Sequence, residues 1–117
     1  MHNFKKLDIW NKSVELVADT YRLVNTFPQI ERFGLISQMQ RAAVSIPTNI
    51  AEGSAKSSNK DFVRFLEISL GSAYELETEL LVSFKLSYIE SEMYEQFQQK
   101  LSELQRMING FKDTLYQ

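Results

Sequence analysis

The stretch LISQMQRAAVSIPTNIAEG, residues 35–53, has two faces of different character when it is read at helical spacing. Small or apolar residues recur three or four positions apart, which is typical of a helix that buries one side. These residues are Leu35, Met39, Ala42, Ile46, Ile50 and Gly53. The polar residues of the other face are Gln38, Arg41, Ser45, Asn49, Glu52 and Lys56. The stretch therefore predicts an amphipathic helix whose polar face suits a specific partner.

Three further helices are predicted around this one. Apolar periodicity predicts helices over residues 7–26, 60–87 and 91–115. The last has a seam with the 3.5-residue period of bundle packing: Tyr94, Phe97, Leu101, Leu104, Ile108, Phe111 and Leu115. Four helices with short connectors predict an all-α, antiparallel up-down-up-down four-helix bundle, with residues 1–117 forming a single domain.

Proline and the small polar residues predict where helices end or bend. Phe27-Pro28 would end the first helix, because the residue before proline is disfavoured in helical conformation. The central helix should run from residues 33–35 to 55, with Pro47 inside it. We expect a kink at Pro47, or else two shorter helices with Pro47 in the first turn of the second. Ser58 or Asn59 should cap the next helix. Gly71-Ser72 should allow another helix to approach closely.

Composition argues against catalytic and metal-binding functions. The chain has no cysteine, so disulfides and thiolate sites are excluded. Di-metal carboxylate bundles use two Glu-x-x-His motifs, whereas His2 is the single histidine of this chain. The run Glu75, Glu77 and Glu79 is therefore interpreted as structural. We expect no enzyme activity, no cofactor and no metal, in a cytoplasmic protein without a signal peptide or membrane segment.

Two predicted helices have more apolar circumference than one bundle requires. Residues 7–26 carry one stripe of Trp10, Val14, Val17, Tyr21 and Val24 and a second stripe seven residues apart. Residues 60–87 likewise carry a second stripe beside the principal one. We expect the second stripes to form an oligomer interface, with core packing in a splayed monomer as the alternative. They consist of Ile9, Leu16, Leu23, Val63, Leu70, Tyr74 and Leu81.

The net charge of −2 conceals an uneven distribution. Residues 1–12 carry +2 and residues 32–64 carry +3, whereas residues 65–117 carry −5. A polyanion could therefore approach only the N-terminus and the segment around the central helix. The candidate nucleic-acid contacts in that segment are Arg41, Lys56, Lys60 and Arg64.

Three interpretations of the polar face remain open. It could be a buried network that fixes helix register or a subunit contact, with Arg41 paired to Glu75 or Glu77. It could be a ligand surface for nucleic acid. It could also be an ordinary solvated face.

Several segments resemble a known family. The motifs SQMQRAAVSIPTNIAEG (residues 37–53), RFLEISLGS (64–72) and YELE (74–77), with LDIW near the start, resemble bacterial four-helix-bundle proteins encoded by intervening sequences in 23S rRNA genes. The accessory variability protein of diversity-generating retroelements is similar, although it is markedly basic. The resemblance implies a ring-like homopentamer and an RNA or ribonucleoprotein partner. The family's polar signature would fall on Gln38, Arg41, Ser45, Asn49, Glu52, Ser72 and Glu75.

These observations favour a non-enzymatic, homo-oligomeric adaptor that binds RNA or a ribonucleoprotein through a locally basic face. The competing hypothesis is a protein-binding scaffold without a nucleic-acid role, whose polar stripe is a structural network.

Overall fold

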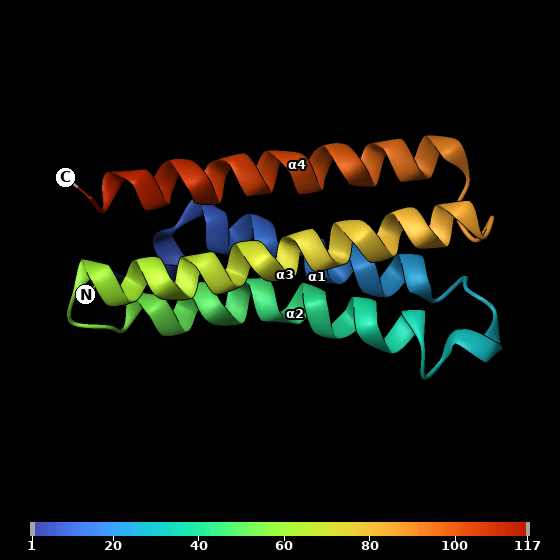
Figure 1. The fold of residues 1–117 in the computed structure, drawn as a ribbon, viewed down its shortest axis with the longest axis horizontal. Coiled ribbons are helices and arrows are strands. Elements are labelled where there is room, and N and C mark those ends of the chain that lie inside the picture. Colours follow the sequence, from blue (N-terminus) through green and yellow to red (C-terminus); the bar gives the residue numbers. More distant parts are fainter. Residues whose placement is uncertain (1, 117) are drawn as a thin grey trace.

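The computed structural model describes residues 2–116, which form four long helices, each antiparallel to the next (Figure 1). The predicted all-α class and its four-helix arrangement are therefore confirmed. The bundle measures 44 × 24 × 20 Å. Its helices are α1 (Asp8–Val24), α2 (Leu35–Ser54), α3 (Asn59–Lys85) and α4 (Ser91–Thr114). Two short 3-10 helices that the sequence did not predict precede α1 and α2; they are η1 (Phe4–Lys6) and η2 (Gln29–Glu31). None of the helices in residues 2–116 combines the length and the apolar character needed to span a membrane.

The helix ends lie within two residues of the predicted positions. Helix α1 ends at Val24, shortly before Phe27-Pro28. Ser58 caps α3 as predicted, because its hydroxyl accepts a hydrogen bond from the backbone N–H of Asp61 at 3.2 Å. Helix α2 runs unbroken through Pro47, so the alternative of two shorter helices is wrong. The kink at Pro47 stays a prediction.

The core is formed by the apolar faces of α2, α3 and α4, as the periodicity predicted. Met39, Ile46 and Ile50 of α2 are fully buried. They lie in the same core cluster as Leu76 of α3 and Leu101 of α4.

The buried side of α1 takes residues from both predicted stripes, because Val24 of the first stripe is buried together with Ile9 and Leu16 of the second. Ile9 and Leu16 are buried within a single chain, so the prediction that they lie on an oligomer interface is corrected. Val14 is exposed instead, and so is Tyr21. The positions between the buried apolar residues are taken by two fully buried hydroxyl side chains, those of Ser13 and Thr20.

These two hydroxyls explain why apolar periodicity does not reveal the buried face of α1. Ser13 donates to the carbonyl of Trp10 at 2.8 Å, and Thr20 donates to the carbonyl of Leu16 at 2.7 Å. A hydroxyl that is satisfied by its own helix can be buried without an unpaired polar atom. A pattern that counts serine and threonine as polar therefore misses this face.

The second stripe of α3 is divided in the same way. Val63 and Leu70 are buried in the single chain, which corrects their assignment to an oligomer interface. Tyr74 and Leu81 are 50% and 42% exposed, and Leu23 of α1 is half-buried. Their part in an interface stays a prediction.

The close approach of α2 to α3 occurs at Gly53 and not at Gly71. A methyl group at Gly53 would lie 2.7 Å from Cβ of Phe65 and 2.8 Å from Cδ1 of Phe62. At Gly71 a methyl group would meet no atom within 4 Å, so the expectation of close helix packing there is wrong within one chain.

Candidate functional site

The polar face of α2 meets α3 through a small group of hydrogen bonds. Ser72 donates to the hydroxyl of Ser45 at 2.8 Å, and the Asn49 amide donates to the same hydroxyl at 2.9 Å. Asn49 also bonds the backbone carbonyl of Ser45 at 2.8 Å. Below this surface, buried Ser69 donates to the carbonyl of Ile46 at 2.9 Å. Part of the predicted polar signature is thus a structural network that sets the register of α2 against α3.

Glu79 is a buried carboxyl group beside this network. Its side chain is 8% exposed, and its Oε1 accepts no hydrogen bond from the described residues. Burial, together with the neighbouring charge and hydrogen bond of Glu75, raises the pKa of Glu79 from 4.5 to about 7. The contacts of Ser72 with Ser45 and of Ser83 with Met39 flank Glu79 along α3, so the opposite turn of α2 is residues 38–42.

Arg41 lies on that turn but makes no ion pair within residues 2–116. Its side chain is exposed, as are those of Gln38 and Glu52. The predicted intrachain pairing of Arg41 with Glu75 or Glu77 is therefore absent from the described chain. Within the single chain only the Ser45 and Asn49 part of the stripe is partly covered, so a buried network of the whole stripe at a subunit contact stays a prediction.

Glu77 faces α4, on the other side of α3 from the polar face of α2. Its two oxygens accept hydrogen bonds from the amides of Gln98 at 2.9 Å and Gln105 at 2.8 Å. Two amide donors thus hold this carboxylate in place of a cation. The two donors belong to α4, a helix that only the fold brings alongside Glu77.

The predicted nucleic-acid contacts separate into two places. Lys56 and Lys60 lie at the turn between α2 and α3, where Lys56 Nζ stands 4.9 Å from the centre of the Phe65 ring. Arg64 follows one turn later and pairs with Asp61 at 3.5 Å. Arg41 lies 13 residues before Ser54, where α2 ends, which is about 20 Å along the helix axis. It therefore does not belong to this cluster.

The fold adds the basic N-terminal segment to this end of the bundle. Figure 1 shows both termini at the end where α2 turns into α3. The backbone N–H of His2 donates to the carbonyl of Ser54 at 3.1 Å, and η1, which contains Lys5 and Lys6, contacts both α1 and α2. We call the cluster of Lys5, Lys6, Lys56 and Lys60 the basic end; its members are exposed and none has an ion pair within the described residues.

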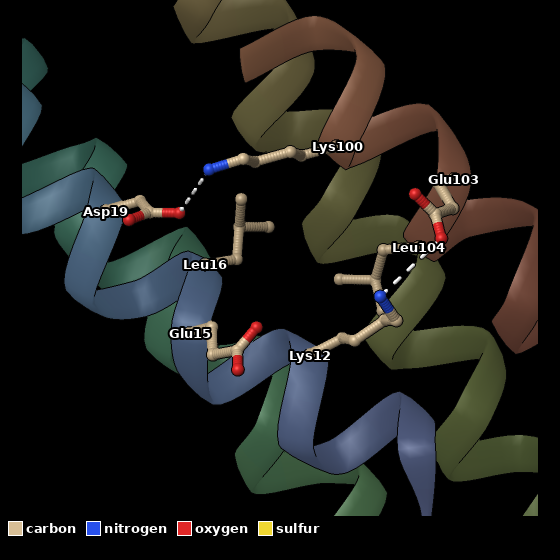
Figure 2. A pocket seen from close by; sticks show the side chains of 7 residues that line it. All are labelled: Lys12, Glu15, Leu16, Asp19, Lys100, Glu103 and Leu104. Carbon is tan, nitrogen blue, oxygen red and sulfur yellow. Dashed lines mark hydrogen bonds and ion pairs between the residues drawn. The ribbon is translucent and has the colours of Figure 1, made fainter. Parts of the chain in front are cut away.

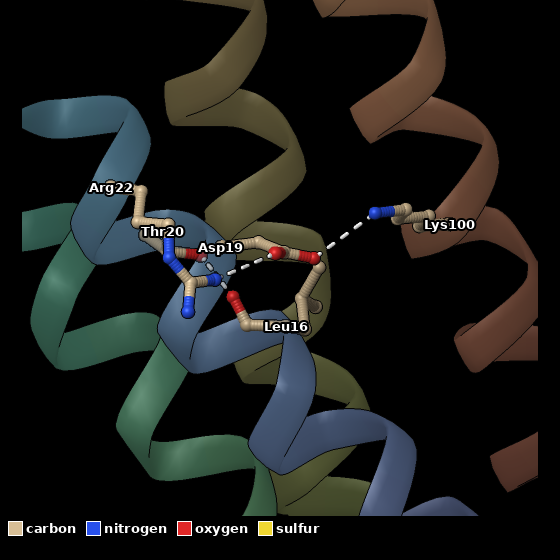
Figure 3. A network of polar contacts seen from close by, with 5 residues as sticks. All are labelled: Leu16, Asp19, Thr20, Arg22 and Lys100. Atoms are coloured by element: carbon tan, nitrogen blue, oxygen red, sulfur yellow. Dashed lines mark hydrogen bonds and ion pairs between the residues drawn. The ribbon is translucent and has the colours of Figure 1, made fainter. Parts of the chain in front are cut away.

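A groove between α1 and α4 carries lysines and carboxylates on both of its walls (Figure 2). Lys12 pairs with Glu103 at 3.6 Å, and Lys100 pairs with Asp19 at 3.1 Å. Asp19 also pairs with Arg22 at 3.3 Å. Figure 3 shows Asp19 between Arg22 and Lys100, its two partners. The two pairs between α1 and α4 join residues that are 81 and 91 positions apart, so no local sequence signal connects them.

No group of three or more histidine, cysteine or acidic side chains in residues 2–116 could hold a metal ion. His2 packs against aromatic rings, with its ring centre 5.1 Å from that of Phe62 and 5.8 Å from that of Phe111. The arrangement is suited to binding through charges and hydrogen bonds.

Comparison with known proteins agrees with this architecture. Residues 5–110 match the family model of the 23S rRNA-intervening sequence protein. No curated protein matches the chain. A solved structure of a protein of unknown function from the S23 ribosomal protein family of Bacteroides thetaiotaomicron is similar, with a TM-score of 0.79 and 28% identity over 89% of this chain and 97% of that chain. The predicted family is thus confirmed: the chain belongs to the family of 23S rRNA-intervening sequence proteins.

Proposed function

We propose that this chain is a non-enzymatic, homo-oligomeric adaptor that contacts RNA, alone or within a ribonucleoprotein, through its basic end. One observation carries the proposal. Two basic segments some fifty residues apart in sequence meet at one end of the bundle, where Lys5, Lys6, Lys56 and Lys60 have no ion pair within residues 2–116. Lysines that are free of carboxylates can neutralise phosphates and release their counterions.

The rest of the surface limits how RNA could bind. The chain carries −2, so the homopentamer implied by the family resemblance would carry −10 from five copies. This net charge opposes non-specific binding and leaves the basic end as the surface where a phosphate backbone is attracted. In a ring, five basic ends would be presented together, and their weak contacts would reinforce one another.

The test is binding of a structured RNA hairpin over a range of salt concentrations. Lys56→Ala/Lys60→Ala should weaken binding and lower the slope of log affinity against log salt by about one for each phosphate that the variant no longer neutralises. Lys85→Ala/Arg106→Ala is the matched control, because it removes the same charge from exposed positions outside the basic end. Absence of binding by the unmodified chain at about 50 mM salt would remove RNA from the proposal.

The alternative function is a protein-binding scaffold. The hydrogen bonds among Ser45, Asn49 and Ser72 favour it, because they give part of the polar signature a structural role. Under this alternative the chain still assembles, and the Lys56→Ala/Lys60→Ala variant has the same affinity for RNA at low salt as the unmodified chain.

A further inference from the structure

A shallow hollow lies at the same end of the bundle as the basic end, between the start of α1 and the last turns of α4. Its volume is about 400 Å³, which is within the range of sites that hold small ligands. Five of its lining residues are apolar or glycine. They are Leu7, Ile9, Met107, Gly110 and Phe111. Lys6 also lines the hollow, so this apolar surface continues directly into the basic end.

Two charged residues, Lys6 and Asp8, line this hollow. Both are exposed, and neither has an ion pair within residues 2–116. The Lys6 ammonium attracts a phosphate group, whereas the Asp8 carboxylate repels phosphate and accepts hydrogen bonds. A ligand that suits both residues therefore carries an anionic group at one place and a hydrogen-bond donor at another, with an apolar or aromatic part between them.

The chain holds both sides of the hollow in place. On the side of η1, the Asn11 amide donates to the backbone carbonyl of Lys5 at 3.0 Å, which ties η1 to α1. On the side of α4, the half-buried Phe111 ring packs against the rings of His2 and Phe62, whose centres lie 5.8 Å and 5.5 Å away. A side chain that is already held by its neighbours loses little freedom when a ligand covers it.

We propose that the hollow receives an unpaired RNA base that carries an exocyclic amino group. The base contacts the Phe111 ring, its amino group donates to Asp8, and its phosphate lies against Lys6. Aromatic side chains beside cationic ones bind single strands in this way, because every base has an apolar face. A base inside a duplex cannot enter, since its faces and its amino group are already engaged. This inference rests on the proposed RNA binding and names the form of RNA and the class of base.

Two single-stranded oligonucleotides of about eight nucleotides test the class of base. Oligocytidine should bind about tenfold more tightly than oligouridine in fluorescence anisotropy at low salt, because cytosine presents an amino group to a carboxylate and uracil presents a carbonyl oxygen. Asp8→Asn should remove most of this preference, since an amide also offers uracil a donor. Glu95→Gln removes the same charge from an exposed position outside the hollow and should keep the preference. Equal preference in Asp8→Asn and the unmodified chain would overturn the contact with Asp8.

Filling the hollow tests the place of the base independently. A Cβ atom at Gly110 would meet no atom within 4 Å, so a side chain can be added there without a clash. Gly110→Leu should raise the dissociation constant for oligocytidine at least about fivefold, because the leucine occupies the place of the base. Gly71→Leu makes the same change at another open glycine, outside the hollow, and should leave the affinity unchanged. Leucine is the better helix former, so thermal unfolding should find both variants folded. Equal affinity in the two variants would overturn the hollow as the base site.

The outcomes separate this inference from the proposed function. If hairpin binding depends on Lys56 and Lys60 while Gly110→Leu and Asp8→Asn change neither affinity nor base preference, only the base site is overturned. If no RNA binds at low salt, the proposed function fails and this inference fails with it.

Cytidine monophosphate distinguishes RNA from a free nucleotide as the source of the base. It should displace oligocytidine only at a concentration at least about tenfold above the dissociation constant of the oligonucleotide, because it brings no phosphates to the other lysines. Displacement at a concentration equal to that constant would assign the hollow to a free nucleotide and overturn its role in RNA binding.

Discussion

At the scale of the residue, Glu79 stands out because the pKa of its carboxyl group is raised well above the ordinary value. Its carboxyl group lies beside the Glu75 carboxylate on its own helix. Burial and the Glu75 charge both favour the protonated form. The pKa of about 7 means that this group changes charge in the neutral range.

This raised pKa makes the stability of a single chain depend on pH. Between pH 4.5 and 7 the folded chain keeps a proton on Glu79 that the unfolded chain releases. The stabilisation is therefore fully present below about pH 4.5 and is lost as the pH rises to about 7. Glu79→Gln cannot ionise, so it should raise the free energy of unfolding at pH 8 by about 1 to 3 kcal/mol. Urea unfolding at pH 5 and pH 8 measures the difference.

The measurement is made at a concentration where sedimentation finds single chains, so that self-association does not contribute to the free energy of unfolding. Glu95→Gln, at an exposed position on α4, is the matched control and should change the free energy of unfolding by less than about 0.5 kcal/mol. An equal pH dependence in Glu79→Gln and the unmodified chain would contradict the assignment of this dependence to Glu79.

Ser69 provides a second prediction at this scale. Its fully buried hydroxyl donates to the carbonyl of Ile46 on the neighbouring helix. Ser69→Ala should lower the free energy of unfolding by about 1 kcal/mol, because it removes a buried interhelical hydrogen bond. Ser102→Ala, on the half-buried face of α4, is a useful comparison, since its hydroxyl only accepts a bond from Gln98 of its own helix. A Ser69→Ala variant as stable as the unmodified chain would show that this bond contributes nothing.

At the scale of the element, the packing of α2 on α3 depends on one glycine. Gly53 lets the backbone of α2 approach Phe62 and Phe65 at distances that leave no room for a methyl group. Aromatic rings on a buried helix face have little freedom to move aside. The two helices would therefore have to separate locally if a side chain were added.

Two alanine substitutions test this contact. Gly53→Ala should lower the free energy of unfolding by about 1 to 3 kcal/mol through overpacking. Gly71→Ala should raise it by about 0.5 to 1 kcal/mol, because the position is open and alanine is the better helix former. Thermal unfolding of the two variants gives opposite shifts in Tm. Shifts of the same sign would contradict the close approach at Gly53.

At the scale of the whole molecule, the fold joins charges that the sequence separates. Lys5 and Lys6 belong to η1, whereas Lys56 and Lys60 belong to the turn that begins α3. Both groups lie at the end of the bundle that holds the two termini (Figure 1). In contrast, Lys12 and Lys100, which line the α1–α4 groove, are already paired with carboxylates.

Because the two groups form one surface, both should contribute to RNA binding. Lys5→Ala/Lys6→Ala should reduce the affinity for a structured RNA and its salt dependence to about the same extent as Lys56→Ala/Lys60→Ala. Lys12→Ala/Lys100→Ala removes an equal charge from the groove and serves as the control. If only one of the two lysine pairs of the basic end matters, the two segments do not act as one surface.

The four helices, their ends and the buried faces of α2 and α4 follow from the sequence. These features depend on local signals, namely apolar periodicity, the Ser58 cap and Phe27-Pro28. Only the packing of α1 against the other helices decided which side of α1 is buried; that side includes Ser13 and Thr20, whose hydroxyls are satisfied within the helix.

The burial of Glu79 without a hydrogen-bond partner for Oε1 and the meeting of the two basic segments also depend on the tertiary structure. Burial and electrostatic interactions depend on which distant helices pack together. That choice is made by the summed contacts of the whole core and cannot be read from any one stretch of the chain.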